Sequence, residues 1–248
     1  MPPRIAICYW GMTRSTRMVY QTHQKHIFDV LRSHGAEFDV YLHTWKTELN
    51  IVWTEACPIE HDYTEHKYLN PIQYCIDDQD DFLSNIRLED YYYAHEKHSE
   101  WWPDLIRNHI CALESQRRCV NMMIASNRPY DYVMFLRPDA LFMCDLPYRE
   151  IFDVFSQFGI SGAPKVLPPI VIPDDKKYHG KNDQFAVVPF SHVLPYSHRL
   201  QYMADYRQIH GVITSEKYVG YVIDQYYCVH YITFPFNLIR SDGKSNMS

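Results

Sequence analysis

The 248-residue sequence has no apolar run that approaches the roughly 18 to 20 residues of a membrane-spanning helix. Its seven cysteines include no C-x-x-C pair, which excludes a zinc ribbon and a thioredoxin-like redox motif. The cysteines are scattered through mostly apolar segments, which indicates a reducing compartment. The formal net charge of −6 argues against a nucleic-acid coat protein, because phosphate neutralisation requires a basic face.

Several sequence signatures of common enzyme classes are also missing. The first loop contains neither G-x-G-x-x-G nor G-x-x-x-x-G-K-[ST], which disfavours a dinucleotide-dependent dehydrogenase and a P-loop enzyme. The fourteen histidines include no H-E-x-x-H motif, so a zinc-dependent hydrolase finds little support. The apolar stretch before Gly11 is too short for a signal peptide, and the expected location is therefore the cytoplasm.

The sequence is instead rich in aromatic residues, with 21 tyrosines and an aromatic content of 15%. A chain of this length buries roughly 70 to 75% of its unfolded surface, which is ample for one core. No linker, repeat or low-complexity tract divides the chain, so residues 1–248 are expected to form a single domain.

Alternation of apolar runs and helical spacing predicts an α/β fold. Residues 4–9 and 38–45 are expected to be strands on either side of a helix over 13–33, which makes a βαβ unit with parallel strands. A helix over 103–127 precedes a strand over 130–136. Further expected elements are a short strand within 140–144, an apolar segment over 166–172, helices over 193–210 and 215–222, and a sheet-closing segment over 226–238. The prediction is a central mixed, mostly parallel sheet flanked by helices, with residues 46–102 inserted beside it as strands and loops.

In such a sheet, ligands bind at the carboxyl ends of the strands. Four segments meet this criterion: Tyr9–Arg14, His43–Trp45, Arg137–Asp139 and Lys181–Gln184. Their convergence predicts a pocket with an aromatic wall, guanidinium groups and two carboxylates.

Each of these segments has a functional and a structural interpretation. Trp10 and Gly11 would let a base and ribose lie flat against the backbone while Arg14 reaches a phosphate; the alternative is an ordinary turn with Arg14 in solvent. Asp139 would hold a divalent cation on a diphosphate, or it would cap a turn or pair with Arg137.

The segment Tyr130–Asp139 resembles the strand and the Asp-x-Asp end of nucleotide-sugar glycosyltransferases of the GT-A fold. More narrowly, the chain is similar to glycosyltransferases encoded by chlorella viruses and other large DNA viruses. The matching blocks, which run through nearly the whole chain, are Ile7–Gly11, Thr13–Ser15, Phe38–Trp45, Ala112–Arg117, Leu136–Asp139, Asn182–Phe185 and Ile239–Gly243.

This resemblance implies transfer of a sugar from a nucleotide-diphosphate sugar, commonly a UDP-sugar with Mn²⁺ or Mg²⁺, to a hydroxyl of a glycan. The expected acceptor is a glycan of a viral structural protein. It implies that the metal ligand is Asp139, the second Asp of the motif. Arg137 replaces the first Asp, and the alternative is that Arg137 itself clamps the diphosphate. The expected donor-binding residues are Tyr9, Trp10, Gly11, Arg14, Thr44, Arg117 and Arg137.

Other polar residues have less specific assignments. Asp183 is the candidate catalytic residue, as a general base or as a group that orients donor or acceptor, and the alternative is a surface loop. Arg117 reaches the donor or pairs with Glu114, three residues earlier. Asp77–Asp81 is a rival metal site, although no hydrophobic strand is expected to lead into it. The remaining candidates are His179 near the phosphates, Glu216 on acceptor hydroxyls, and Arg240 and Lys244 over the diphosphate.

Two alternatives to the enzyme remain open. One is a non-catalytic protein that binds a nucleotide or sugar on the same fold, because the Asp-x-Asp motif is incomplete. The other is a metal hydrolase that uses the histidines or the acidic cluster.

Overall fold

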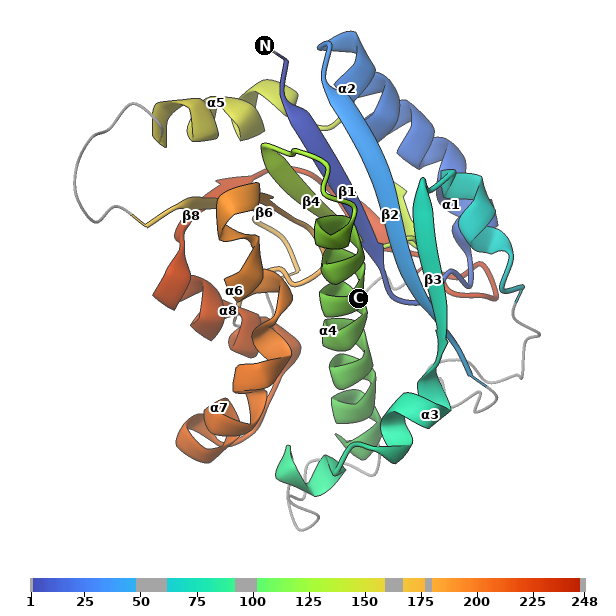
Figure 1. The fold of residues 1–248 in the computed structure, drawn as a ribbon, viewed down its shortest axis with the longest axis vertical. Helices are drawn as coiled ribbons and strands as arrows, with labels where there is room; N and C mark the ends of the chain where they lie inside the picture. The colour runs from blue at the N-terminus through green and yellow to red at the C-terminus, as the bar shows by residue number, and fades with distance from the viewer. Residues whose placement is uncertain (1, 48–61, 92–101, 159–166, 177–179, 246–248) are drawn as a thin grey trace.

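Seven strands form the central sheet, and helices cover both of its faces (Figure 1). The computed structural model describes residues 2–47, 62–91, 102–158, 167–176 and 180–245. The strand order is β3-β2-β1-β4-β7-β6-β8. The bounds are Arg4–Trp10 for β1, Glu37–Lys46 for β2, Gln73–Asp78 for β3, Tyr132–Leu136 for β4, Pro169–Pro173 for β6, Ala186–Pro189 for β7 and Cys228–Ile232 for β8.

Parallel pairing dominates this sheet, which confirms the predicted fold class. Strands β1, β2, β3 and β4 are mutually parallel, whereas β7 runs antiparallel to both β4 and β6. A second, two-stranded antiparallel sheet joins β5 (Ala140–Phe142) to β9 (Phe236–Leu238). Among the described residues, no helix has the length and apolarity required to span a bilayer.

The helices form two groups, one on each face of the central sheet. One group contains α1 (Thr16–His23), the π-helical turn η1 (Gln24–Phe28), α2 (Asp29–Ser33) and α5 (Tyr148–Phe158). The other contains α4 (Trp102–Ala125), α6 (Val193–Ser197), η5 (Arg199–Tyr202), α7 (Met203–His210) and α8 (Ser215–Tyr226). Short elements also occur at η2 (Glu65–Leu69), α3 (Gln79–Ser84), η3 (Leu88–Asp90) and η4 (Phe190–His192).

Alternation along the strands explains why both faces are covered. In β1, Ile5 and Ile7 pack toward η1 and α2, while Ala6 and Cys8 pack toward α4. Both sets are fully buried. A strand buried on both faces has a nearly continuous apolar sequence, which is the pattern from which β1 and β4 were predicted.

Two predictions require correction. The helix expected over 193–210 is three short pieces, since the chain turns at His198 and buries Arg199 against α4. Asp77 and Asp78 are the last residues of β3, which joins the sheet as its edge strand next to β2, and Gln79–Asp81 begin α3. This edge strand is only half-buried and lacks the apolar run of the others.

The strand order positions the carboxyl ends of β1 and β4 side by side. The chain proceeds from β1 outward to β2 and β3 and then returns across β1 to β4. The order of the strands therefore reverses at β1, and the carboxyl ends of the strands at such a point are the usual ligand position in an open α/β sheet.

Candidate active site

Cationic side chains gather around one buried carboxylate beyond the carboxyl ends of β1 and β4. Asp139, three residues beyond β4, is fully buried. Its two oxygens accept hydrogen bonds from Arg137 Nε and Nη2, both at 2.9 Å. Arg14, from the loop after β1, donates to Asp139 Oδ2 through Nη2 at 3.3 Å. Two arginines predicted as donor-binding residues therefore meet at the predicted metal ligand.

Together, the positive charges of these side chains lower the pKa of Asp139. Burial raises the pKa of this carboxyl group, but Arg137, Arg14 and Arg240 outweigh burial and lower the pKa to about 2. Burial also lowers the pKa of Lys176, and the negative charge of Asp139 opposes this shift. Three guanidinium groups and one amine therefore lie close enough to Asp139 to interact electrostatically with it.

The second sheet brings the end of the chain to this site. Ala140 pairs with Leu238 across β5 and β9, and the Ile239 N–H donates to the Asp139 carbonyl at 2.9 Å. The hydroxyl of Ser15 donates to the Ile239 carbonyl at 2.7 Å. Arg240 follows directly, which explains its effect on Asp139.

The Arg137 guanidinium lies against Trp10, the last residue of β1, and Gly11, the first residue of the loop that follows. Its guanidinium carbon lies 4.8 Å from the ring centroid of Trp10. A Cβ on Gly11 would be 2.9 Å from Arg137 Nη1, and Gly11 has a φ of +94°. Because an L-residue is strained in this region and its side chain would collide with Arg137, the position requires glycine.

Asp183 lies in the segment that precedes β7 and interacts electrostatically with Arg137. Strand β7 is antiparallel to β4, and Ala186 pairs with Phe135, so residues 182–185 lie beyond the carboxyl end of β4. Burial raises the pKa of Asp183, and the positive charges of Arg199 and Arg137 oppose this rise. The predicted catalytic residue is therefore near the cationic cluster.

A series of hydrogen bonds through Ser115 and His43 connects the loop after β1 to Asp77. The Gly11 N–H donates to Ser115 Oγ at 2.9 Å, and Ser115 Oγ lies 2.8 Å from His43 Nδ1. His43 Nε2 lies 3.1 Å from Asp77 Oδ2, and Arg118 also donates to this carboxylate. Burial raises the pKa of Asp77, but hydrogen bonds from Arg118, Cys75 and His43 lower it to about 2. Because ionised Asp77 accepts from Nε2–H, Nδ1 is an acceptor, and the Ser115 hydroxyl lies within reach both of Nδ1 and of the His43 carbonyl, to which it donates at 3.1 Å.

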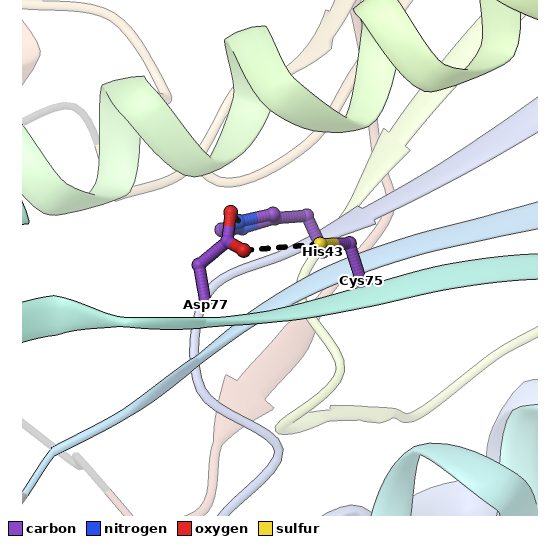
Figure 2. A group of neighbouring side chains, drawn as sticks. All are labelled: His43, Cys75 and Asp77. Carbon is purple, nitrogen blue, oxygen red and sulfur yellow. Dashed lines mark hydrogen bonds and ion pairs between the residues drawn. The ribbon is translucent and has the colours of Figure 1, made fainter.

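Among the described residues, one group of neighbouring side chains is of the types that can bind a metal ion: His43, Cys75 and Asp77. One potential ligand atom from each lies within 4.8 Å of the other two, beneath α4 (Figure 2). His43 and Cys75 are register partners on β2 and β3, and the Cys75 thiol donates to Asp77 at 3.2 Å. Since Arg118 already pairs with Asp77, the arrangement is a satisfied hydrogen-bond network.

Three predicted donor-binding residues have other partners or no exposed surface. Tyr9 is fully buried, with its hydroxyl 2.8 Å from His23 Nδ1. Thr44 is fully buried, and its hydroxyl has no partner among the described residues. Arg117 makes a two-point contact with Glu114, at 2.7 Å for each bond, which is the alternative that its spacing predicted. His179 lies outside the described residues.

The arrangement of the sheet is shared with solved structures. The sequence itself matches no protein-family model and no curated protein sequence. Core-mannan synthase A from Aspergillus fumigatus, in its Mn/GDP form, superposes with a TM-score of 0.51 at 8% identity, over 96% of this chain and 75% of that chain. The chain has the fold of a glycosyltransferase.

Two further glycosyltransferase structures are similar at lower scores. Mouse xyloside xylosyltransferase 1 matches with a TM-score of 0.43 and 11% identity, over 94% of this chain and 85% of its own. A glycosyltransferase that glycosylates the major capsid of PBCV-1 matches with a TM-score of 0.38 and 12% identity, over 93% and 82%.

Within this glycosyltransferase fold, Lys176 is a site residue that the sequence did not suggest. Its amine donates to the Phe236 carbonyl and lies 4.0 Å from the Phe236 ring centroid. The contact joins the segment after β6 to β9, about 60 residues later in the chain. A lysine in a polar loop carries no spacing pattern that would reveal this position.

Proposed function

We propose that the protein transfers a sugar from a nucleotide-diphosphate sugar, with UDP as the expected nucleotide, to a hydroxyl of a glycan acceptor. The observation that carries the proposal is the gathering of Arg14, Arg137, Lys176 and Arg240 around Asp139, beyond the carboxyl ends of β1 and β4. A diphosphate needs this kind of cationic surface both to bind and to leave with its charge neutralised.

The shared fold supports a nucleotide diphosphate as the ligand. The A. fumigatus core-mannan synthase structure of the same fold is a Mn/GDP form. In the present chain, the loop after β1 offers a glycine backbone under Arg137, and guanidinium groups match the oxygens of a phosphate in a two-point contact. The acceptor on a viral structural protein stays a prediction.

A divalent cation at Asp139 fits poorly with the side chains around it. Both carboxylate oxygens accept hydrogen bonds from Arg137, and the described groups that lower the Asp139 pKa are cations. Metal sites for hard cations use several carboxylate or carbonyl oxygens. We therefore propose that cationic side chains neutralise the diphosphate, while metal ligation by Asp139 requires its release from Arg137.

The test is a thermal-shift panel of UDP, GDP and their sugars, in EDTA and in Mn²⁺. We expect one nucleotide diphosphate to stabilise the protein in EDTA. In Arg137→Gln its affinity should fall about 30- to 100-fold, because a two-point charged contact is lost. Arg32→Gln, an exposed arginine that pairs with Asp29, is the matched control and should bind like the wild type.

Each alternative has its own outcome. Binding that requires Mn²⁺ and disappears in Asp139→Asn would show that Asp139 is a metal ligand and that the side-chain clamp is wrong. Binding without hydrolysis or transfer of any donor would favour a non-catalytic nucleotide-binding protein. A chain that binds no nucleotide diphosphate under either condition does not have the proposed function.

A further inference from the structure

The side chains of His43, Cys75 and Asp77 converge between the edge of the central sheet and α4 (Figure 2). His43 and Cys75 are register partners on β2 and β3, so their side chains leave the sheet on the same face. Asp77 is two residues after Cys75 on β3, and residues at this spacing also share a face. Two adjacent parallel strands therefore place an imidazole, a thiol and a carboxyl group together.

The separations of these three groups are close to those of ligands on one metal ion. His43 Nε2 lies 3.1 Å from Asp77 Oδ2, and Cys75 Sγ lies 3.2 Å from Asp77 Oδ1. One ligand atom from each residue lies within 4.8 Å of the other two. Zinc bonds of about 2.0 to 2.3 Å in tetrahedral geometry place neighbouring ligand atoms about 3.3 to 3.7 Å apart. Only small side-chain movements would bring all three atoms onto one ion.

The cluster is closed on its inner side and open on its outer side. The His43 side chain is fully buried, whereas 32% of the Asp77 side chain is exposed and Cys75 is half-buried. An ion can therefore reach the thiol and the carboxylate from solvent while the imidazole is fixed in the interior. Water would complete a tetrahedral coordination shell from the outer side.

Arg118 holds the carboxylate of Asp77 in a position that leaves one oxygen for a metal ion. The guanidinium of Arg118 donates to Asp77 Oδ2 and, through Nε, to Glu114 at 2.7 Å. It also lies 4.9 Å from the ring centroid of Trp45. The other oxygen of Asp77, Oδ1, accepts the Cys75 thiol. Carboxylates that bind metal ions are commonly oriented by such a second hydrogen-bond partner.

Ser115 is able to support the imidazole of His43 when its Nε2 binds a metal ion. In that state the ring carries its proton on Nδ1, which lies 2.8 Å from Ser115 Oγ. The Ser115 hydroxyl donates to the His43 carbonyl at 3.1 Å and accepts the Gly11 N–H at 2.9 Å. A hydroxyl has two lone pairs, so Ser115 accepts Nδ1–H as well. Metal binding therefore leaves no polar atom of this group without a partner.

We propose that His43, Cys75 and Asp77 bind a Zn²⁺ ion, with water as the fourth ligand. A nitrogen, a thiolate and a carboxylate oxygen suit Zn²⁺, whereas Mg²⁺ and Ca²⁺ take oxygen ligands. The Cys75 thiol proton leaves to solvent and the ring proton of His43 moves from Nε2 to Nδ1, so one proton is released for each ion bound. The ion would fasten the edge strand β3 to β2, and the proposal is independent of nucleotide binding.

The test titrates the reduced protein with Co²⁺, which substitutes for Zn²⁺ and gives a charge-transfer absorption band when a thiolate is bound. We expect one Co²⁺ per chain with this band, and Zn²⁺ should abolish the band by displacement. In Cys75→Ser the band should be absent. In Asp77→Asn the affinity for Co²⁺ should fall at least about tenfold, because a ligand is lost. Cys228→Ser, which changes an exposed cysteine of β8, is the matched control and should behave like the wild type.

X-ray absorption by the zinc-loaded wild type provides a readout that needs no substitution. We expect a coordination shell of one sulfur and three nitrogen or oxygen atoms. A shell with no sulfur or with several, a wild type without the cobalt–thiolate band, or a band that persists in Cys75→Ser would overturn the proposal. Failure of the wild type to bind any nucleotide would contradict only the proposed function.

Discussion

Gly11 is required for a backbone reason and for a steric reason, and mutations at two glycines separate them. Its φ of +94° is strained for any other residue, and its missing Cβ leaves room for Arg137. Gly35 has a similar φ of +73°, but nothing lies within 4 Å of its absent Cβ. The two glycines therefore share the backbone requirement and differ only in the steric one.

We expect Gly11→Ala to weaken binding of the nucleotide diphosphate at least about tenfold, since Arg137 must move away from Trp10 and Asp139. Gly35→Ala should cost a similar amount of backbone strain, about 1 to 2 kcal/mol, without changing affinity. Isothermal titration and urea unfolding of both variants measure the two effects. Equal affinities in the two variants would mean that the position of Arg137 is unimportant for the ligand.

At the scale of single residues, the sequence predicted Arg240 and the residues that follow apolar strands, but it did not predict Lys176. Arg14, Arg137 and Asp139 lie directly after β1 and β4, so the topology of the sheet brings them together as expected. Lys176 follows a strand that lies farther along the sheet, and its approach depends on the packing of β9. The partner of Arg117 was ambiguous because helical spacing allowed both a ligand and Glu114.

Helix α4 contributes Ser115 to the support of the loop after β1. Ser115 is fully buried and connects the Gly11 backbone to His43 and, through it, to Asp77 at the sheet edge. Its removal would leave the Gly11 N–H buried without an acceptor, which costs about 1 to 3 kcal/mol. Ser115 thus positions the loop after β1, which we propose to bind the donor, without itself contacting the ligand.

We expect Ser115→Ala to weaken nucleotide binding and to lower the urea midpoint, and Ser115→Thr to recover part of the affinity because it restores a hydroxyl. Ser126→Ala is the matched control. Ser126 follows the same helix and accepts the Tyr41 hydroxyl at 2.8 Å, so its loss should reduce stability alone. A Ser115→Ala protein with wild-type affinity would show that α4 does not position the loop.

Among the elements, the longer strands with buried apolar runs were predicted, whereas the four-residue β7 was not, although it is mostly buried. Strands β1, β2 and β4 have long apolar runs, and the parallel βαβ unit was read from them. Strand β3 was not recognised as the continuation of the sheet, because an edge strand is half-exposed and this one ends in acidic residues. The break after α6 was not predicted, because it depends on a hydrogen bond from Arg199 to Gln116 of α4, which is distant in the sequence.

At the scale of the whole molecule, the positive charge of the side chains around Asp139 contrasts with the negative net charge of the chain. The formal net charge is −6, yet four cationic side chains gather around Asp139. The net charge of the chain therefore does not predict the charge of this cluster, which we propose to bind the diphosphate. A small anion of the right shape should find it without any sugar or base attached.

We expect inorganic pyrophosphate to raise the melting temperature and the increase to shrink between 0.05 and 1 M NaCl, as the Debye length falls to roughly 3 Å. Arg14→Gln should reduce the increase because one of the four cations is lost. Differential scanning calorimetry measures both effects. Stabilisation that is independent of salt and of Arg14 would place pyrophosphate elsewhere.

The contact between Ser15 and the Ile239 carbonyl links residues 224 positions apart, and Arg14 meets Asp139 across 125 positions. Contacts with such separations form late, because the chain must first lose the entropy of closing long loops. The cationic cluster is thus completed only after the two ends of the chain have met. A folding intermediate in which β9 has not yet docked would contain most of the sheet and still lack the binding site, so ligand binding would mark the last step of folding.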